Sequence, residues 1–140
     1  KEMLYRVAFG YLHDETKSLD AVDEAVYQGY VHRNDLREPK FLKTWVTRIL
    51  INECFKIIRN GKRELNMDVL PENQQDSVED SIHIKLVINN LPEDLRKVII
   101  LRYFGGFTIS ETAEILGIPD GTVSTRSRKA LEILRVEVSD

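Results

Sequence analysis

Residues 108–126 read TISETAEILGIPDGTVSTR, and this stretch indicates the fold of the C-terminal part of the chain. Thr108 and Glu111 have the spacing of a capping box, which marks the start of a helix. Gly117 permits a tight turn before a second helix, because glycine accepts backbone conformations that other residues avoid. The order of helix, glycine turn and helix predicts a helix-turn-helix from about Thr108 to Leu134.

The second helix of this motif has two different faces. Its apolar face, from Val123 to Leu134, is expected in the core. Hydroxyls and cations that suit base edges and phosphates lie on the other side: Thr122, Ser124, Thr125, Arg126, Arg128 and Lys129. We predict that this set contacts DNA, although three cations on a helix are often only a solvated surface. Ser127 falls on the apolar stripe, and we expect it to face a partly open edge.

Helical periodicity also accounts for the rest of the chain. Apolar residues at helical spacing predict a helix that includes Leu4, a second helix over residues 18–32 and a long one over residues 40–60. Gly61 follows the long helix and is expected to cap it in a left-handed conformation. In the second helix the predicted apolar face consists of Leu19, Val22, Val26 and Tyr30. No stretch has a strand pattern, so the predicted fold class is all-α.

Charge divides the chain into three parts. The total is −3, from 20 Lys and Arg against 23 Asp and Glu. Residues 1–63 carry 12 basic and 9 acidic side chains, residues 64–81 carry 6 acids and no base, and residues 82–140 carry 8 of each. We predict two small helical domains, at 1–63 and 82–140, joined by a flexible acidic linker at 64–81. Because local patches set phosphate attraction, the negative total does not exclude DNA binding.

The long helix has two faces as well. A buried stripe is predicted from Leu42, Val46, Ile49, Leu50 and Ile57. A second face mixes aromatics, an amide and cations, which suits melted DNA: Phe41, Trp45, Arg48, Asn52, Lys56 and Arg59. The alternative is that Phe41 and Trp45 are ordinary core aromatics. Arg48 can also be partly structural, with its stem packed and its head extended.

Nothing in the sequence indicates an enzyme. His13, His32 and His83 are scattered, without a cysteine or carboxylate set at metal-ligand spacing. There is no glycine loop of the kind that holds phosphates. We therefore predict no catalytic residue, no metal, no cofactor and no small-molecule substrate. Cys54 lies beside apolar residues and is predicted to be packed rather than reactive.

Composition predicts a cytoplasmic location. A single cysteine cannot form an internal disulfide, which favours a reducing compartment. The longest apolar runs are far too short to span a membrane, and no signal-peptide pattern is present. The chain begins at Lys1, already in helical pattern, so we expect that it has been trimmed at this end.

Two separate stretches together resemble one family. Residues 91–104, LPEDLRKVIILRYF, followed by 108–126, resemble region 4 of the extracytoplasmic-function (ECF) sigma factors of the sigma-70 family. Residues 18–27, SLDAVDEAVY, look like region 2.2, and residues 41–54, FLKTWVTRILINEC, look like regions 2.3 and 2.4. The resemblance covers nearly the whole chain in the family's order. The C-terminal motif alone is only moderately specific, whereas the ordered pair is a strong signal.

The resemblance implies that the chain binds core RNA polymerase and directs it to promoters. Region 2 of the family binds the β′ clamp helices and melts the −10 element, and region 4 binds the −35 element and the β flap. The implied polymerase-binding residues are Asp20, Asp23, Glu24 and Tyr27. The implied −10 set is the second face of the long helix, and the implied −35 set is the outer face of the last helix. The loop of residues 34–40 would then lie near the base that is flipped during melting.

Two departures from the family pattern limit what can be carried over. Asp23 stands where the family more often has Gln, which changes the hydrogen bonding at that point. Before Arg126 the family more often has Val-Lys-Ser, whereas this chain has Val123, Ser124 and Thr125. A lost lysine weakens phosphate attraction but leaves hydroxyls that bind bases or phosphates. The family's −35 base preference is therefore not expected to transfer.

The resemblance also implies an inhibitor and leaves alternatives open. Family members are commonly held inactive by a membrane-linked anti-sigma factor until a stress response, and we expect such a partner here. The acidic linker is either solvated or follows a basic channel of the polymerase. The first alternative function is a helix-turn-helix regulator that binds duplex DNA without polymerase. The second is a protein-interaction adaptor or decoy.

Overall fold

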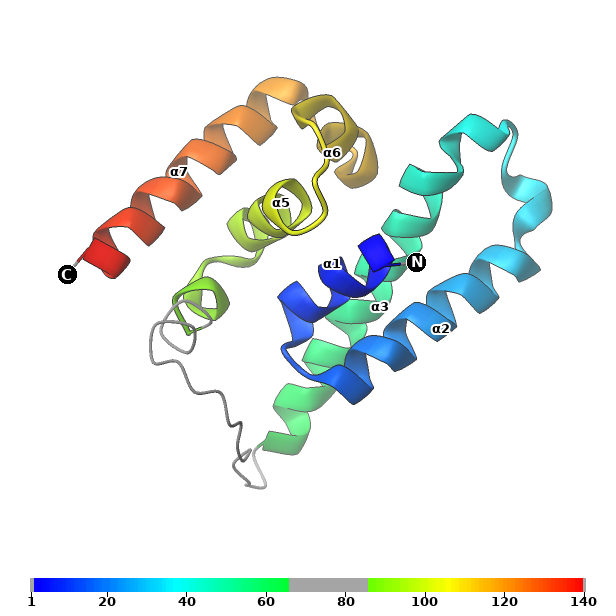
Figure 1. Cartoon of the computed structure of the whole chain (residues 1–140), viewed down its shortest axis with the longest axis horizontal. Coiled ribbons are helices and arrows are strands. Elements are labelled where there is room, and N and C mark those ends of the chain that lie inside the picture. The colour runs from blue at the N-terminus through cyan, green and yellow to red at the C-terminus, as the bar shows by residue number, and fades with distance from the viewer. Residues whose placement is uncertain (1, 66–85, 140) are drawn as a thin grey trace.

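A computed structural model describes residues 2–65 and 86–139, and all regular structure within them is helical, as predicted (Figure 1). The N-terminal half, residues 2–65, contains α1 (Glu2–Leu12), α2 (Glu15–Val31), the 3₁₀ turns η1 (Arg33–Asp35) and η2 (Pro39–Phe41), and α3 (Leu42–Leu65). The C-terminal half, residues 86–139, contains a short helical segment at 86–90, α5 (Glu93–Tyr103), α6 (Ile109–Leu116) and α7 (Asp120–Ser139). No helix in these two stretches has the length and apolar character needed to cross a membrane.

Helix α3 extends further than the sequence predicts. The expected left-handed cap at Gly61 is wrong, because α3 continues to Leu65 and Gly61 does not have a positive φ. Glycine inside a helix costs only about 1 kcal/mol relative to alanine, and the good helix formers Lys, Arg and Glu follow at 62–64. The helix thus takes in the first two residues of the predicted linker. The other linker residues, 66–81, lie outside the described part of the chain.

The turn between α1 and α2 is fixed by local hydrogen bonding. Asp14 has an extended backbone, and its carboxylate accepts a hydrogen bond from the backbone N–H of Lys17 at 2.8 Å, so it caps α2. His13, just before it, has a φ of 54° in the left-handed region, which is uncommon for a residue with a side chain. This tight reversal allows α1 and α2 to pack against each other.

The face that α2 turns to the core is not the predicted one. Leu19 is 48% exposed and Tyr30 is 63% exposed, Val26 is also exposed, and only Val22 of the predicted stripe is buried. The core side instead consists of mostly small residues at helical spacing: Ser18, Ala21, Val22, Ala25 and Gly29. Small side chains let helices approach closely, and at Gly29 an added Cβ would already lie 3.3 Å from Val46 of α3. Close packing therefore leaves the large apolar side chains of α2 on the surface.

The buried face of α3 is also rotated relative to the prediction. Within the predicted stripe Leu50 is buried, Val46, Ile49 and Ile57 are partly buried, and Leu42 is 49% exposed. The residues of α3 in the core are Thr47, Leu50, Ile51, Cys54 and Phe55. The reason is that α3 has neighbours on more than one side, since it contacts α2, α1 and α6. Thr47 satisfies its buried hydroxyl by donating to the Lys43 carbonyl at 2.7 Å.

Helices α6 and α7 form the predicted helix-turn-helix. The capping box is present: the Glu111 N–H donates to Thr108 Oγ1 at 3.0 Å, and the Thr108 N–H donates to Glu111 Oε1 at 2.9 Å. Gly117 follows α6 with a φ of 71°, the left-handed turn that its sequence position predicts. Ala113 is buried with Val98 of α5 and Val123 of α7, where the three helices meet.

Ser127 does not face an open edge as expected. It is only 7% exposed, and its hydroxyl has no hydrogen-bond partner among the residues that the structure describes. Val123 and Ala130, on the same face of α7, are fully buried. Because serine is small, α7 can pack against its neighbours over this position, and the stripe stays continuous.

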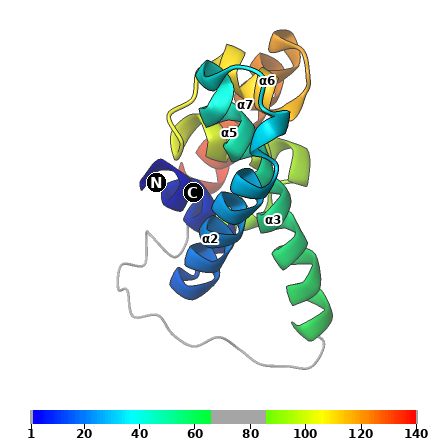
Figure 2. The ribbon, with the colours of Figure 1, turned by 90° about the vertical axis from the view of Figure 1, so that its right-hand side faces the viewer.

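The two halves share one hydrophobic core (Figures 1 and 2). Figure 1 shows α1 between α5 and the α2–α3 pair, and α1 contacts all three of these helices. Helix α3 in addition contacts α6. The core cluster includes Tyr11 and Leu50 from the N-terminal half, and Ile100, Phe107 and Ile115 from the C-terminal half. The sequence predicts the helices, but it does not predict this contact between the halves.

Candidate nucleic-acid interface

The predicted DNA-contacting set of α7 lies largely on the surface. Thr125, Arg128 and Lys129 are exposed, while Thr122 and Ser124 are partly buried at the start of the helix. Arg126 is also partly buried, and its Nε lies 3.7 Å from Asp94 Oδ2 at the beginning of α5, so part of its charge is compensated. The positive charge of this face is therefore carried mainly by Arg128 and Lys129. Two cations and several hydroxyls at one helix end can bind phosphates and base edges of a duplex.

The predicted set of α3 falls into two groups. Asn52, Lys56 and Arg59 are exposed, Phe41 is 41% exposed, and Trp45 is partly buried. Neither aromatic side chain is a fully buried core residue. Arg48 differs from the rest, because its guanidinium is bonded to the backbone of α6.

Arg48 Nε donates to the carbonyl of Ile115 at 2.9 Å, and its Nη2 donates to the carbonyl of Glu114. These carbonyls belong to the last turn of α6, where a helix has acceptors without intrahelical partners and a negative partial charge. An arginine is well matched to two neighbouring carbonyls. The sequence suggested a partly structural arginine, but its partner could not be read from spacing, since it is 66 and 67 positions away.

Part of the α3 set lines a polar hollow of about 460 Å³ beside the loop that joins α2 to α3. The side chains around it combine an indole, two amides and charged groups: Gln28, His32, Asp35, Trp45, Ile49, Asn52, Glu53 and Lys56. Lys56 Nζ is 3.8 Å from Glu53 Oε2, so part of its charge is compensated locally. Such a lining offers both a stacking surface and hydrogen-bonding groups for an unpaired base.

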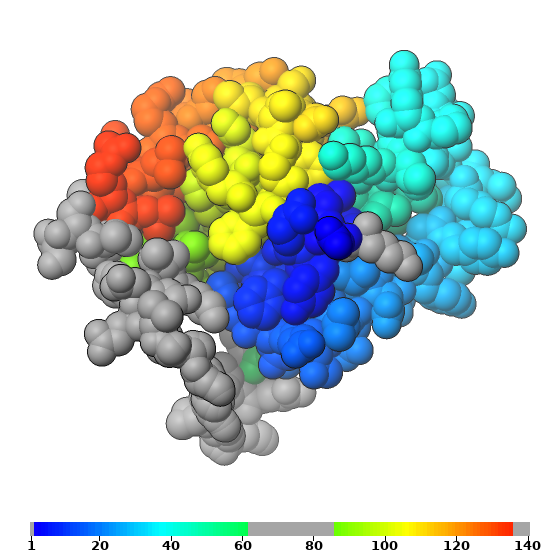
Figure 3. Space-filling view, in the orientation of Figure 1, coloured from blue at the N-terminus to red at the C-terminus, as the bar shows by residue number. Residues whose placement is uncertain are grey.

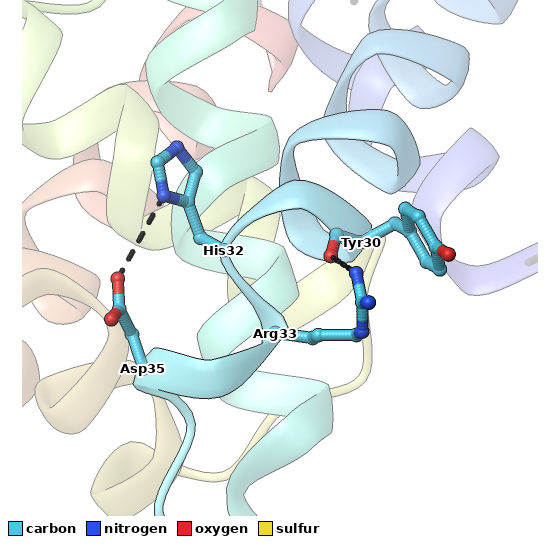
Figure 4. Close-up of polar contacts among 4 residues, drawn as sticks. All are labelled: Tyr30, His32, Arg33 and Asp35. Atoms are coloured by element: carbon cyan, nitrogen blue, oxygen red, sulfur yellow. Dashed lines mark hydrogen bonds and ion pairs between the residues drawn. The ribbon is translucent and has the colours of Figure 1, made fainter.

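A second hollow lies beside the same loop, and Trp45 lines both hollows. Figure 4 shows His32 and Asp35 on one side, with Nδ1 and Oδ2 at 3.7 Å, and Tyr30 and Arg33 on the other. Arg33 lies over the Tyr30 ring at 4.1 Å from its centroid and donates to the Tyr30 carbonyl at 2.8 Å. The second hollow, of about 630 Å³, is mainly apolar and lies between α1, α2 and the start of α3. Leu36, Pro39 and Lys40, from the loop that the sequence analysis expected near a flipped base, are part of its lining.

The predicted polymerase-binding residues lie on α2. Asp20 and Asp23 are exposed, Tyr27 is 60% exposed, and Glu24 is partly buried and accepts a hydrogen bond from Gln28 at 2.7 Å. The exposed apolar side chains of α2 alternate with these acids along the helix, so the surface is both acidic and apolar: Leu19, Val26, Tyr27 and Tyr30. Large exposed apolar patches commonly mark protein interaction sites. The sequence signal for the exposure of these apolar side chains was the row of small residues on the opposite, core-facing side of α2.

The candidate surfaces do not form one site. Figure 1 shows α2 and α7 at opposite edges of the molecule, with α1, α3, α5 and α6 between them. The structure thus brings Asn52 and Lys56 near Trp45 around one hollow, and it keeps the α7 set apart from them. The molecule presents three surfaces with different chemistry.

Two buried titratable groups belong to the core rather than to these surfaces. Burial raises the pKa of the Tyr11 phenol well above its usual value, and its O–H donates to the Lys97 carbonyl at 2.9 Å. Burial also raises the pKa of the Cys54 thiol to about 12, with a smaller contribution from the nearby Glu53. A fully buried thiol with a raised pKa is a poor nucleophile, so Cys54 is packed as predicted.

Both halves of the sequence match known families. Residues 1–64 match the family described as Sigma-70 region 2, and residues 83–134 match Sigma-70, region 4. The chain is 30% identical over 159 residues to the ECF RNA polymerase sigma factor SigW of Bacillus subtilis (strain 168), covering 100% of this chain and 85% of that protein. It is 29% identical over 144 residues to the RNA polymerase sigma factor SigV of the same organism, covering 99% and 86%.

Solved structures share the arrangement of helices. The sigma factor RpoE of Bartonella quintana, in a co-crystal structure with the anti-sigma factor NepR, superposes with a TM-score of 0.76 over 97% of this chain and 89% of that one, at 25% identity. CnrH, in complex with the cytosolic domain of CnrY, gives a TM-score of 0.75 over 98% and 80%, at 20% identity. Because each superposition spans nearly the whole chain, it includes the relative placement of the two halves.

Proposed function

Because the chain belongs to the sigma-70 family and is an ECF sigma factor, we propose that it binds core RNA polymerase and directs it to promoters through two DNA surfaces. A member of this family is a transcription initiation factor and not an enzyme. The observation that carries the proposal is the ordered pair of region 2 and region 4 in one chain. A helix-turn-helix regulator that acts without polymerase has no need of region 2, so that alternative is not favoured.

For the −35 element we propose the exposed end of α7 as the reader. Its Thr125, Arg128 and Lys129 are free to enter a major groove, and the capping box with the Gly117 turn fixes the angle between α6 and α7. Thr122, Ser124 and Arg126 complete the set at positions closer to the core. The set has three hydroxyls and three cations, so base edges and phosphates share these contacts.

For the −10 element we propose the polar hollow beside α3. Trp45 offers a stacking face, Asn52 offers an amide for a base edge, and Lys56 and Arg59 attract the backbone of a single strand. Phe41 is exposed at the end of η2, directly before α3, where it can contact the same strand. Arg48 would join this surface only after it leaves α6.

For core polymerase we propose the acidic and apolar face of α2 as the docking surface for the β′ clamp helices. Asp20, Asp23 and Glu24 supply charge, and Tyr27 with Leu19 supplies apolar area that is exposed in the isolated chain. The β flap would be bound by the C-terminal half, as the family implies. Because α2 and α7 lie at opposite edges, polymerase and the −35 element can be bound at once.

We further propose that an anti-sigma factor holds this chain inactive. The support is that one structural neighbour is a sigma factor in complex with the anti-sigma factor NepR, and this chain superposes on it over 97% of its length. We also propose that this inhibitor is linked to the membrane and that stress releases the sigma factor into the cytoplasm. Affinity capture from membrane and soluble fractions of unstressed cells tests it, and recovery of polymerase alone would contradict it.

Runoff transcription with purified core polymerase tests the main proposal. Added to core enzyme and a promoter library, the protein should give discrete transcripts that core enzyme alone does not give. A chain that neither binds core enzyme nor supports initiation on any promoter would contradict the proposal. Binding to duplex DNA with equal affinity in the absence of core enzyme would instead favour the regulator.

Two variants separate the surfaces. Asp20→Lys with Asp23→Lys should weaken binding to core polymerase by about tenfold or more. The reason is that the double variant reverses the charge of the proposed docking surface. Lys17→Ala, an exposed residue of the same helix, is the matched control and should leave binding unchanged. Equal binding by the double variant would exclude this face of α2 as the docking surface.

A further inference from the structure

Arg126 differs from the other two cations of the proposed −35 set because it has an acidic partner. Its Nε lies 3.7 Å from Asp94 Oδ2, across the contact between α7 and α5. Arg128 and Lys129 have no ion pair with any residue that the structure describes. Arg126 is also the first cation along α7. The helix-turn-helix thus presents two unpaired cations and one that is held by another helix of the same half.

The separation of this ion pair is set by the hydrophobic contact beside it. Val98 lies one turn after Asp94 in α5. Val123 lies one turn before Arg126 in α7, so each valine shares a helix face with one charged residue. Both valines are fully buried in one cluster. Figure 3 shows the side chains of α7 (orange) and those of the α5–α6 part (yellow) as one continuous surface. Because cores are close-packed, this contact keeps the two charged side chains within reach of each other.

The main effect of the pair is on orientation rather than on stability. Asp94 is the second residue of α5, where the positive end of the helix dipole favours an acid. Its side chain is 53% exposed and that of Arg126 is 33% exposed, and ion pairs this accessible contribute little to the free energy of unfolding. Arginine otherwise populates many rotamers. A fixed carboxylate beside Nε therefore restricts where the guanidinium of Arg126 lies.

The contact leaves most of the guanidinium available to DNA. Arginine has five N–H donors, and Asp94 is closest to Nε, so both Nη groups are without a partner among the described residues. A guanidinium held in one plane can bind two acceptors on one base edge in the major groove. A guanidinium that turns freely can contact any nearby phosphate, and such a contact carries no sequence information. The orientation of Arg126 thus decides which of these contacts it makes.

We propose that Asp94 is a positioning residue for −35 recognition, which holds Arg126 in an orientation that favours a base edge over phosphates. Asp94 acts through Arg126 and needs no contact with DNA. It also compensates part of the charge of Arg126, and so lowers the attraction of α7 to DNA of unrelated sequence. This inference rests on the proposed role of α7 at the −35 element, and it adds a residue of α5 to the determinants of that site.

Binding of the full chain to a dye-labelled duplex of mixed sequence tests the restraint without polymerase. Asp94→Asn keeps the size of the side chain but removes its charge, so Arg126 gains a phosphate contact. The slope of log affinity against log salt should steepen by about 0.9, the value for one added phosphate. Glu93→Gln is the matched control, because this acid of the same helix turn pairs with Lys97 at 3.3 Å and not with Arg126. An equal slope in Asp94→Asn and the parent would overturn the restraint.

Discrimination between promoters tests the orientation. The probes are a promoter duplex recovered by runoff transcription and the same duplex with a scrambled −35 element, each bound by the chain together with core polymerase. Asp94→Asn should lower the ratio of the two affinities by about fivefold or more, the weight of one base contact. Asp94→Glu keeps the carboxylate and should retain part of the ratio, and Glu93→Gln should retain all of it. In an Arg126→Ala background, Asp94→Asn should change neither the ratio nor the salt slope.

Stability distinguishes positioning from a structural role. Asp94→Asn and the parent should have the same urea midpoint, because the pair is exposed. A large loss of stability, an unchanged affinity ratio, or an equal effect in the Arg126→Ala background would overturn the proposal. A parent chain that supports no initiation would instead contradict the sigma-factor proposal. The salt slope of the chain alone would then still show whether Asp94 restrains Arg126.

Discussion

The two halves of the molecule differ in how their proposed DNA surfaces are placed. The proposed −35 surface of α7 is exposed at Thr125, Arg128 and Lys129, and the capped helix α6 and the Gly117 turn that precede α7 belong to the same half. The α3 surface is incomplete, because Arg48 is engaged by the other half. A surface that depends only on local structure is therefore available in the free chain. A surface at the interface between the halves has part of its hydrogen-bonding groups engaged by the other half.

The largest effect is expected from a substitution in the core that the two halves share. Ile100 of α5 is fully buried and touches α1, so Ile100→Ala should lower the free energy of unfolding by about 3 kcal/mol. Trp45, the single tryptophan, reports on the N-terminal half, while circular dichroism reports on all helices. Both signals should shift together in urea. Ile133→Ala, at a 37% exposed position, is the control with a small effect. An unchanged Trp45 transition would show that the halves unfold independently.

The next largest effect is expected on transcription, from substitutions in the exposed surface of α7. Arg128→Ala with Lys129→Ala should reduce promoter-specific transcription by about tenfold, because two phosphate or base contacts are lost. Stability should not change, since both side chains are exposed. Runoff transcription and thermal unfolding measure the two quantities. Lys17→Ala on α2 is the charge control. Full activity in the double variant would remove the exposed end of α7 from the −35 contact.

The local turn in the C-terminal half should have a smaller effect. Gly117→Ala places a side chain at a φ of 71°, which costs about 1–2 kcal/mol for a residue other than glycine. Gly121→Ala, only four positions away, lies in α7 with nothing within 4 Å of the added Cβ, and it should stabilise by up to about 1 kcal/mol. Urea unfolding of both variants checks the opposite signs. Equal effects would mean that the turn geometry does not matter.

Ionisation of Cys54 should have the smallest effect near neutral pH. The folded-state pKa is raised to about 12, above that of an unfolded thiol at about 8.5, so the neutral form is favoured by folding. This group therefore leaves stability unchanged below about pH 8.5 and lowers it progressively as the pH rises toward 12. At pH 8 a thiol reagent should react slowly with the native protein and rapidly in urea. Glu15→Cys, which is exposed, is the fast-reacting control. Fast reaction of native Cys54 would contradict its burial.

The sequence was most informative where structure depends on neighbours along the chain. The capping box at Thr108 and the left-handed turn at Gly117 need only residues within one helix length, and both are present as predicted. It was less informative about which face of a helix is buried. In α2, size matters more than hydropathy at a close helix contact, so Ala25 and Gly29 face the core and Leu19 does not. Gly61 was assigned to a helix end on residue type alone, although the helix formers after it sustain α3.

What the sequence by itself determined is the class of the molecule: all-α helices and a helix-turn-helix, with the ordered motifs of an ECF sigma factor. These features follow from local propensities and spacing. Only the tertiary structure decided that Arg48 binds the end of α6, and that one core joins both halves. These are contacts between residues far apart in the chain. Their free energy depends on packing and on unpaired carbonyls brought together by folding, and no local pattern records them.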